Sequence, residues 1–259
     1  MFRSFRKVHQ FFIDEIIPSG TILNQQYQVV DILGSGSYGM VYQCNDIYTS
    51  ERKVVKQLRP SKRKNKKEIQ LFNDEKSLIQ KLNHPNMPRY VEAFTEEGNY
   101  YYVMSLINGM NLEEAIFSQL KTFDEKESLQ FVSKLLELVD YLHMKDIYHL
   151  DLRIPNIILK DDEPYLIDFG LAKISNADSR KDNKEDMMLQ DYYDLGDILL
   201  YLLYTTYPSK KKKARPWTEE LSLKKETVYL LKRLLRIHTP YTNINEISVD
   251  IQAAIVANG

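Results

Sequence analysis

The sequence has few of the features that mark secreted or membrane proteins. It contains a single cysteine, Cys44, so no disulfide framework can form within the chain, and a reducing compartment is the simplest expectation. No apolar run reaches the roughly 18 residues of a membrane span. Asp14 and Glu15 interrupt the N-terminal apolar stretch, which excludes a signal-peptide core. We therefore expect a cytoplasmic protein without a transmembrane segment.

An excess of charge of one sign is also missing. The formal net charge is −1 over 259 residues, which gives no global attraction to nucleic acid or membrane. The local exceptions are two basic runs, residues 62–67 and residues 210–213 with Arg215. Solvated loops are the ordinary interpretation of such runs, and docking to an acidic protein, an anionic lipid surface or a nucleic acid is the alternative. No internal repeat is evident, and the length suffices for one large or two small domains.

Two short motifs in the middle of the chain carry polar groups that suggest chemistry. The first is His-Leu-Asp-Leu-Arg-Ile-Pro-Asn at residues 149–156, and the second is Asp-Phe-Gly at residues 168–170. Asp151 lies among apolar neighbours, where burial without a partner would be costly, so a polar cleft is its natural place. Either motif alone could be a turn with an Asn or Asp cap.

The residues between the two motifs predict a hairpin. Strand-like runs at 157–159 and 165–167 would bring Asn156 and Asp168 to the same hairpin mouth, near Asp151. Two carboxylates and an amide suit a hard cation, because Mg2+ takes oxygen ligands and is usually completed by substrate phosphates. The sequence therefore favours a phosphoryl-transfer centre here.

A glycine-rich loop lies between two short β-rich runs, residues 27–33 and 40–44. Its sequence is Gly-Ser-Gly-Ser-Tyr-Gly at residues 34–39, and glycines there let backbone amides approach a triphosphate closely. A flexible turn or a dinucleotide fingerprint is the alternative, but the latter needs a helix directly after the glycines, and residues 40–42 predict a strand. Val41 would then cover a base.

The next strand, residues 53–56, supplies Lys56, for which a surface lysine is the ordinary interpretation. The following helix has an apolar stripe at Phe72, Ile79 and Leu82, and Glu75 falls on that same face. A carboxylate on a buried face needs a partner, and Lys56 is the obvious one.

Later segments predict a strand at residues 100–107, a hinge at 108–109 and several helices. Leu129, Val132, Leu136 and Val139 mark a buried helix, and an apolar helix opens at Asp191 and runs to Tyr204. Two amphipathic helices follow, around 228–237 and 244–257. The charge-dense segment 175–185 predicts mobility.

These motifs, in this order, resemble the eukaryotic-like (Hanks-type) protein kinase family in its soluble bacterial form. The resemblance implies an α+β, bilobal kinase-like fold with a β-rich N-lobe carrying one helix and a mainly helical C-lobe. It also implies an N-terminal extension over 1–26, an N-lobe over 27–107 and a C-lobe over 108–259.

The resemblance implies a role for each matched residue. Asp151 accepts the proton of the substrate hydroxyl, Asn156 and Asp168 hold Mg2+ or Mn2+, and Glu75 pairs with Lys56, which holds the ATP phosphates. Arg153 stands where serine/threonine kinases usually keep a catalytic-loop Lys. Asp191 ties the catalytic loop in place. The remaining ATP-binding positions are Gly34, Ser35, Gly36, Gly39, Val41, Val54, Met104, Ser105, Ile107 and Ile158.

Three departures from the family pattern bear on regulation. Leu150 replaces the Arg that usually precedes the catalytic Asp, Arg153 replaces Lys, and no Ala-Pro-Glu motif follows Gly170. In many kinases the Arg before the catalytic Asp binds a phosphate on the segment after the Asp-Phe-Gly motif. The hydrocarbon side chain of Leu150 cannot bind a phosphate, so we expect activity not to require phosphorylation of Ser175 or Ser179.

The first residues predict an amphipathic basic helix over 2–17, ended by Pro-Ser-Gly at 18–20. A helix packed on the domain is the ordinary interpretation, and a membrane-surface or partner-docking role, with peripheral membrane attachment, is the alternative.

The function that these patterns favour is ATP-dependent transfer of phosphate to a protein hydroxyl, on Ser or Thr. A small-molecule kinase is one alternative, because that related class also lacks Ala-Pro-Glu. A pseudokinase or nucleotide-gated adaptor acting through the basic runs is the other.

Overall fold

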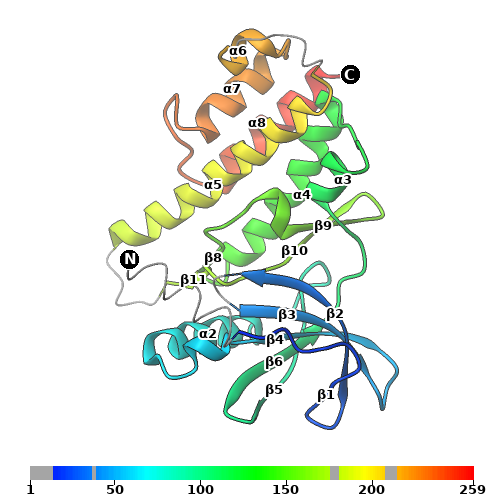
Figure 1. Cartoon of the computed structure of the whole chain (residues 1–259). Coiled ribbons are helices and arrows are strands. Elements are labelled where there is room, and N and C mark those ends of the chain that lie inside the picture. Colours follow the sequence, from blue (N-terminus) through cyan, green and yellow to red (C-terminus); the bar gives the residue numbers. More distant parts are fainter. Residues whose placement is uncertain (1–13, 37–38, 176–180, 208–214) are drawn as a thin grey trace, which may run out of the picture. The chain divides into compact units, whose positions relative to one another are not determined.

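The computed structural model describes residues 14–36, 39–175, 181–207 and 215–259, with only the backbone described for 181–183. The chain divides into two compact units, Met1–Ile107 and Asn108–Gly259 (Figure 1). We call the first the N-terminal unit and the second the C-terminal unit. No helix in the described parts of the chain is long and apolar enough to cross a membrane.

The N-terminal unit is built on one antiparallel sheet. Its six strands follow the order β1-β2-β3-β4-β6-β5, so every neighbour except β4 and β6 is also a neighbour in sequence. The strands are β1 (Ile22–Leu23), β2 (Tyr27–Gly36), β3 (Gly39–Asp46), β4 (Arg52–Gln57), β5 (Tyr90–Glu96) and β6 (Asn99–Ser105). Between β4 and β5 lie the short 3-10 helix η1 (Pro60–Lys62) and the helix α2 (Lys66–Ile79).

The two faces of this sheet have different partners. One face carries a core cluster in which Tyr27, Tyr42 and Val55 are fully buried. Because side chains alternate along a strand, Lys56 on β4 points to the opposite face from Val55. That face packs on α2, where the ring of Phe72 lies 5.1 Å from the ring of Tyr102 on β6. The α2 face of the sheet therefore receives Lys56 together with apolar packing.

The C-terminal unit is mainly helical. Its helices are α3 (Leu112–Phe117), α4 (Glu125–His143), α5 (Lys181–Tyr204), α6 (Trp217–Glu220), α7 (Lys225–Leu234) and α8 (Ile244–Ala257). Two small sheets accompany them, β10-β9-β7 and β11-β8. Their strands are β7 (Met110–Asn111), β8 (Ile147–Tyr148), β9 (Ile157–Lys160), β10 (Glu163–Leu166) and β11 (Lys173–Ile174), with the 3-10 helix η2 (Ile154–Asn156) just before β9.

The helix α4 lies at the centre of the C-terminal core. A capping box between Asp124 and Glu127 starts it, which satisfies two backbone groups of its first turn. Leu129, Val132 and Val139 are fully buried along one stripe, as the spacing predicts. On α5, a Cβ added to Gly196 would lie 2.8 Å from the Cβ of Leu234, so glycine permits the close approach of α5 and α7.

Several predicted boundaries need correction. The helix expected to open at Asp191 begins at Lys181, so residues 181–185 are helical, and residues 176–180 of the segment expected to be mobile lie outside the described residues. The helix expected around 228–237 is α7, which begins at Lys225 and ends at Leu234. Most of the helix expected over 2–17 lies outside the described residues, and residues 14–17, which are described, form no helix.

Candidate functional site

A buried ion pair joins β4 to α2 in the N-terminal unit. The Nζ of Lys56 lies 2.5 Å from the Oε1 of Glu75, and both side chains are only 5% exposed. The hydroxyl of Tyr102 donates a second hydrogen bond to Glu75 Oε1 at 2.9 Å. A carboxylate this deeply buried needs such partners, because an unpaired charge would carry a penalty of several kcal/mol, on the order of 3–5. The structure thus shows the pair that the helical spacing of Glu75 predicts.

The glycine-rich loop closes the β2–β3 hairpin beside this pair. Gly39 is required by its own surroundings, because a Cβ there would lie 2.6 Å from the backbone oxygen of Gln57. A Cβ on Gly34 or Gly36 would meet nothing within 4 Å among the described residues. The space next to these two glycines is therefore open to a ligand, which is what the close approach of a triphosphate needs.

The remaining ATP-binding positions predicted in the N-terminal unit lie on paired strands. Val41 pairs with Lys56, and Val54 pairs with Met104. Ser105 donates its backbone N–H to the oxygen of Arg89 at 2.8 Å. Its carbonyl is therefore the backbone group that could serve an adenine edge. Ile107 is the last residue of this unit and is half-buried, whereas Ile158 belongs to β9 in the C-terminal unit.

In the C-terminal unit, Asn156 holds the carboxylate of Asp151. The Nδ2 of Asn156 donates to both the backbone oxygen and the Oδ2 of Asp151, each at 2.9 Å. This leaves Oδ1 of Asn156 as the amide atom that could coordinate a cation. Arg153 is exposed, and its backbone oxygen accepts the N–H of Asn156 at 2.9 Å as η2 begins.

Asp168 follows directly at the end of the hairpin. The N–H of Ile167 donates to the backbone oxygen of Asn156 at 3.0 Å, which brings the two predicted metal ligands onto neighbouring stretches of chain. Asp168 has φ +60°, and its Oδ1 accepts the N–H of Gly170 at 3.2 Å. An aspartate tolerates this left-handed backbone because its short side chain bonds locally. Two oxygen ligands suit Mg2+, which keeps waters and substrate phosphates in its coordination shell.

The neighbouring Phe169 anchors this turn in the core. Its side chain is 1% exposed, and its ring lies 5.1 Å from the ring of His149. Burial lowers the pKa of His149, which favours the neutral form of the imidazole. The aromatic pair therefore links the first motif to the second through apolar contact.

Asp191 on α5 fixes the backbone that precedes Asp151. It is fully buried, its Oδ2 accepts the N–H of His149 at 3.0 Å, and its Oδ1 accepts the N–H of Leu150 at 2.8 Å. The ring of His143 also lies 2.9 Å from Oδ2. Leu150 has φ +62°, a strained conformation for a leucine, and these bonds hold it there.

A second aspartate on α5, Asp194, was not singled out from the sequence. Its Oδ2 accepts the N–H of Leu152 at 3.3 Å, and its Oδ1 accepts a hydrogen bond from the Nε2 of Gln190 at 2.7 Å. Burial raises the pKa of Asp194 to about 7, and the nearby carboxylates of Asp191 and Asp151 act in the same direction. The signal that could have found it is its position one helical turn after Asp191, on the same face.

The first basic run, residues 62–67, has structural contacts of its own. Lys62 pairs with Glu68 at 2.9 Å, and Arg63 donates to the side chain of Asn99 at 3.2 Å. Asn65 caps α2 by accepting the N–H of Lys67. Residues 210–213 of the second run lie outside the described residues. Docking through either run stays a prediction.

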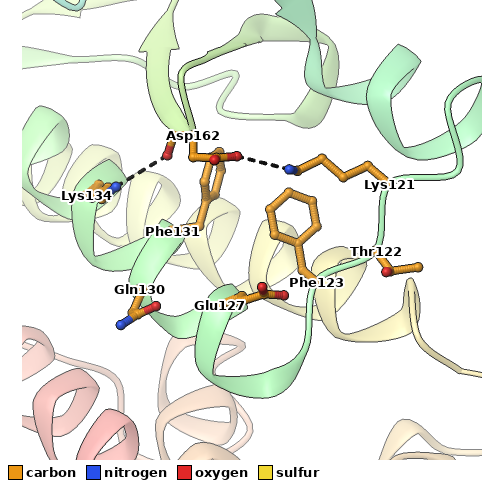
Figure 2. A pocket seen from close by; sticks show the side chains of 8 residues that line it. All are labelled: Lys121, Thr122, Phe123, Glu127, Gln130, Phe131, Lys134 and Asp162. Atoms are coloured by element: carbon orange, nitrogen blue, oxygen red, sulfur yellow. Dashed lines mark hydrogen bonds and ion pairs between the residues drawn. The ribbon is translucent and has the colours of Figure 1, made fainter.

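A pocket of about 270 Å³ lies elsewhere in the C-terminal unit (Figure 2). Lys121, which lines the pocket, pairs with the carboxylate of Asp162 at 3.0 Å, and Lys134 donates to the backbone oxygen of Asp162 at 3.3 Å. Phe123 and Phe131 also line the pocket. None of the predicted site residues lines this pocket.

Comparison with known proteins bears on both units. The model of the family described as "Protein kinase domain" matches residues 27–206. The Bacillus subtilis protein named "Probable serine/threonine-protein kinase YbdM" is 44% identical over 246 residues, which cover 95% of this chain and 96% of that protein. "Serine/threonine-protein kinase B" of Synechocystis is 31% identical over 159 residues, 58% of this chain and 28% of that protein.

The fold has a counterpart among solved structures. The crystal structure of the Mycobacterium tuberculosis PknI kinase domain, in a form with one cysteine replaced by alanine, matches with a TM-score of 0.70 at 18% identity. The match covers 93% of this chain and 99% of that one. At this identity the likeness shows the fold alone: a β-rich N-terminal lobe and a helical C-terminal lobe.

Proposed function

The chain belongs to the protein kinase family, and on this premise we propose that it transfers the γ-phosphate of ATP to serine or threonine hydroxyls of protein substrates. The match over residues 27–206 and the relative that is 44% identical over nearly its whole length support an enzyme of this kind. The single observation that carries the proposal is the buried Lys56–Glu75 pair, because a phosphate-binding lysine fixed by a carboxylate is the mark of an assembled kinase site. Residues 1–26 would be an extension, with lobes over 27–107 and 108–259.

The N-terminal lobe would hold the nucleotide. Gly34 and Gly36 leave open space for the phosphates, and Lys56 would bind the α- and β-phosphates from β4. The side chains of Val41, Val54 and Met104 and the backbone of Ser105 and Ile107 would surround the adenine, with Ile158 contributing from the C-terminal lobe. These assignments follow the family pattern and fit the strand pairing described above.

The C-terminal lobe would supply two kinds of group: the acceptor for the proton of the substrate hydroxyl, and the ligands of the cation. Asp151, held by the amide of Asn156, would accept the proton of the attacking serine or threonine hydroxyl. Asn156 Oδ1 and the carboxylate of Asp168 would hold Mg2+, and Mn2+ takes similar oxygen ligands. When bound, the cation neutralises the negative charge of the phosphates. Arg153, next to η2, would lie near the transferred phosphate.

We also propose that activity does not depend on a phosphate in the segment after Gly170. Leu150 offers no cation at the position where the family usually keeps an Arg. The start of the segment is already held by backbone bonds, since Lys173 pairs with Tyr148 and Ile174 pairs with Ile147.

Incubation with γ-labelled ATP and Mg2+ in the presence of a generic protein substrate tests the proposed function. Phosphoamino-acid analysis of the labelled protein should show phosphoserine or phosphothreonine, and the Asp168→Asn variant should incorporate label at least about a hundredfold more slowly than the parent. Label on a small-molecule acceptor alone would instead support a small-molecule kinase. Nucleotide binding without any transfer would support the non-catalytic alternative.

A further inference from the structure

A polar junction in the N-terminal unit lies outside the residues assigned above. Its centre is Arg59, between β4 and η1, whose guanidinium donates from all three nitrogens. Nε donates to the backbone oxygen of Gly36 at 2.6 Å, and Nη2 donates to the Oγ of Ser35 at 3.0 Å. Nη1 donates to Oδ2 of Asp14 at 2.9 Å. One side chain thus joins the glycine-rich loop to the segment that precedes the first strand.

Asp14 is the buried partner in this junction. Its side chain is 5% exposed, whereas that of Arg59 is 21% exposed. The carboxylate also accepts the N–H of Ser61 at Oδ1 and the hydroxyl of Ser61 at Oδ2, both at 2.9 Å. A surface ion pair contributes little, but a desolvated carboxylate with three donors is strongly fixed. Asp14 therefore holds the guanidinium in one orientation.

The backbone that carries Arg59 is also anchored. The N–H of Leu58 donates to the oxygen of Tyr100 at 3.0 Å, and the N–H of Lys62 donates to the oxygen of Arg59 at 2.8 Å. β4, which ends just before this turn, is the strand that presents Lys56. The same strand, β4, thus carries Lys56 and leads directly into Arg59, which holds the glycine-rich loop.

We propose that Arg59 is a positioning residue for the glycine-rich loop, and that Asp14 holds Arg59 in place, so that the chain before the kinase domain is coupled to nucleotide binding. This rests on the proposed function, in which the loop binds the phosphates of ATP. The carbonyl oxygen of Gly36 carries partial negative charge, so it would repel a phosphate if it pointed toward one. While the guanidinium of Arg59 holds this oxygen, it cannot point at the phosphate. Fixing the Gly36 carbonyl removes that unproductive conformation and lowers the ordering cost of binding.

The expected signature is a change in KM for ATP with kcat nearly unchanged. Arg59→Ala should raise KM for ATP about tenfold, which corresponds to about 1.4 kcal/mol, and should leave KM for the protein substrate within about twofold. Asp14→Asn should raise KM for ATP about threefold. The two substitutions combined should cost no more than Arg59→Ala alone, because both act through one guanidinium.

Two further variants sharpen the test. Arg59→Lys keeps the charge but lacks the planar fork that reaches three acceptors, so its KM for ATP should fall between those of the parent and of Arg59→Ala. Arg63→Ala is the matched control, since this exposed arginine lies in the same turn and its guanidinium donates to the side chain of Asn99. Arg63→Ala should leave both KM values unchanged.

Binding of a non-hydrolysable ATP analogue with Mg2+, measured by calorimetry, separates this inference from the proposed function. A parent protein that does not bind the analogue would overturn the proposed function. A parent that binds it, with Arg59→Ala binding equally well, would overturn the role of Arg59 alone. A fall in kcat at constant KM would also overturn it. If Arg59→Ala does not fold, the same measurements on Arg59→Lys and Asp14→Asn test the role of Arg59.

Discussion

At the scale of single residues, the Lys56–Glu75 pair is placed where an ion pair gains little stability. Both side chains are 5% exposed, and in such surroundings the cost of desolvation roughly cancels the Coulomb attraction. Apolar residues of similar size would stabilise the N-terminal unit at least as well. The pair is therefore better explained by the proposed role of Lys56 in binding the phosphates, with Glu75 and Tyr102 setting the direction of the Lys56 side chain.

Glu75→Gln tests this explanation. Glutamine keeps the size of the side chain and an acceptor for the hydroxyl of Tyr102, but it removes the carboxylate charge that faces the buried Lys56. We expect kcat/KM to fall about tenfold or more and the free energy of unfolding to fall by about 3 kcal/mol. The rates and urea midpoints of the parent, the variant and Asp74→Asn, an exposed neighbour on α2, provide the measurement. An activity change under twofold in Glu75→Gln would contradict the assignment.

Asp168→Asn tests the proposed cation ligand. Asparagine tolerates the left-handed backbone at this position and can still accept the N–H of Gly170, so the turn should persist. The loss of carboxylate charge should reduce kcat by at least about a hundredfold, roughly 2.7 kcal/mol in the barrier. Initial rates over a range of Mg2+ concentrations provide the measurement, with Asp161→Asn in the exposed β9–β10 turn as control. Transfer at the parent rate would remove Asp168 from the site.

The residues that could be predicted are those whose role follows from a local pattern. Glu75 was found because its helical register places a charge on an apolar face. Tyr102 and Arg59 could not be found this way, since their partners lie far away in sequence and no spacing rule connects them. Asp194 lies between these cases, because its position one turn after Asp191 was visible but its contact with Leu152 was not.

At the scale of elements, α5 is the helix that holds the backbone of residues 149–152. Asp191 accepts the N–H groups of His149 and Leu150, and Asp194 accepts that of Leu152. Two carboxylates one turn apart thus hold the backbone on both sides of Asp151. The pKa of Asp194 is raised to about 7, first because of burial and then because of the carboxylates of Asp191 and Asp151.

This arrangement makes part of the stability of the protein depend on pH. In the folded protein the pKa of Asp194 is raised from 3.8 to about 7, so folding favours its protonated form. The stability that this carboxyl contributes is present below its unfolded pKa and is lost as pH rises through about 7. Asp194→Asn should therefore raise the urea midpoint at about pH 8 relative to the parent, with a smaller difference at about pH 5.

The control is Asp186→Asn, an exposed carboxylate on the same helix. It should leave the pH dependence of the urea midpoint as it is in the parent. An Asp194→Asn midpoint that tracks the parent at both pH values would show that this carboxyl titrates in its ordinary range.

The start of α5 shows why an element can be missed although its core is predicted. Its first turns are rich in charged and polar residues, which predicted a mobile segment. Met187, however, is 6% exposed, and it lies on the same helical face as Asp191 and Leu195. The buried Asp191 interrupts this apolar stripe, so hydropathy alone did not extend it. The end of α7 was missed for a related reason, because Arg236 adopts φ +59° without the glycine that usually marks such an end.

At the scale of the whole chain, the segment after Gly170 is the feature that departs most from the family pattern. Its beginning is held without any phosphate, because β11 pairs with β8 and the N–H of Ser175 donates to the oxygen of Asp146 at 2.8 Å. Lys184 at the start of α5 pairs with the carboxylate of the same Asp146 at 2.5 Å. Backbone pairing and the carboxylate of Asp146 thus anchor the beginning of this segment and the start of α5.

Replacing Ser175 and Ser179 together by Ala tests whether a phosphate switch operates. Because Leu150 cannot bind a phosphate and the segment is already anchored at Asp146, we expect the double variant to keep its initial rate within about twofold of the parent. Both proteins are first treated with a phosphatase, which is then removed, and rates are compared on a generic protein substrate. The double replacement of Ser222 and Ser248, two exposed serines elsewhere in the C-terminal unit, is the matched control. A fall of about tenfold in the Ser175 and Ser179 variant alone, roughly 1.4 kcal/mol in the barrier, would show that activation requires a phosphate on this segment.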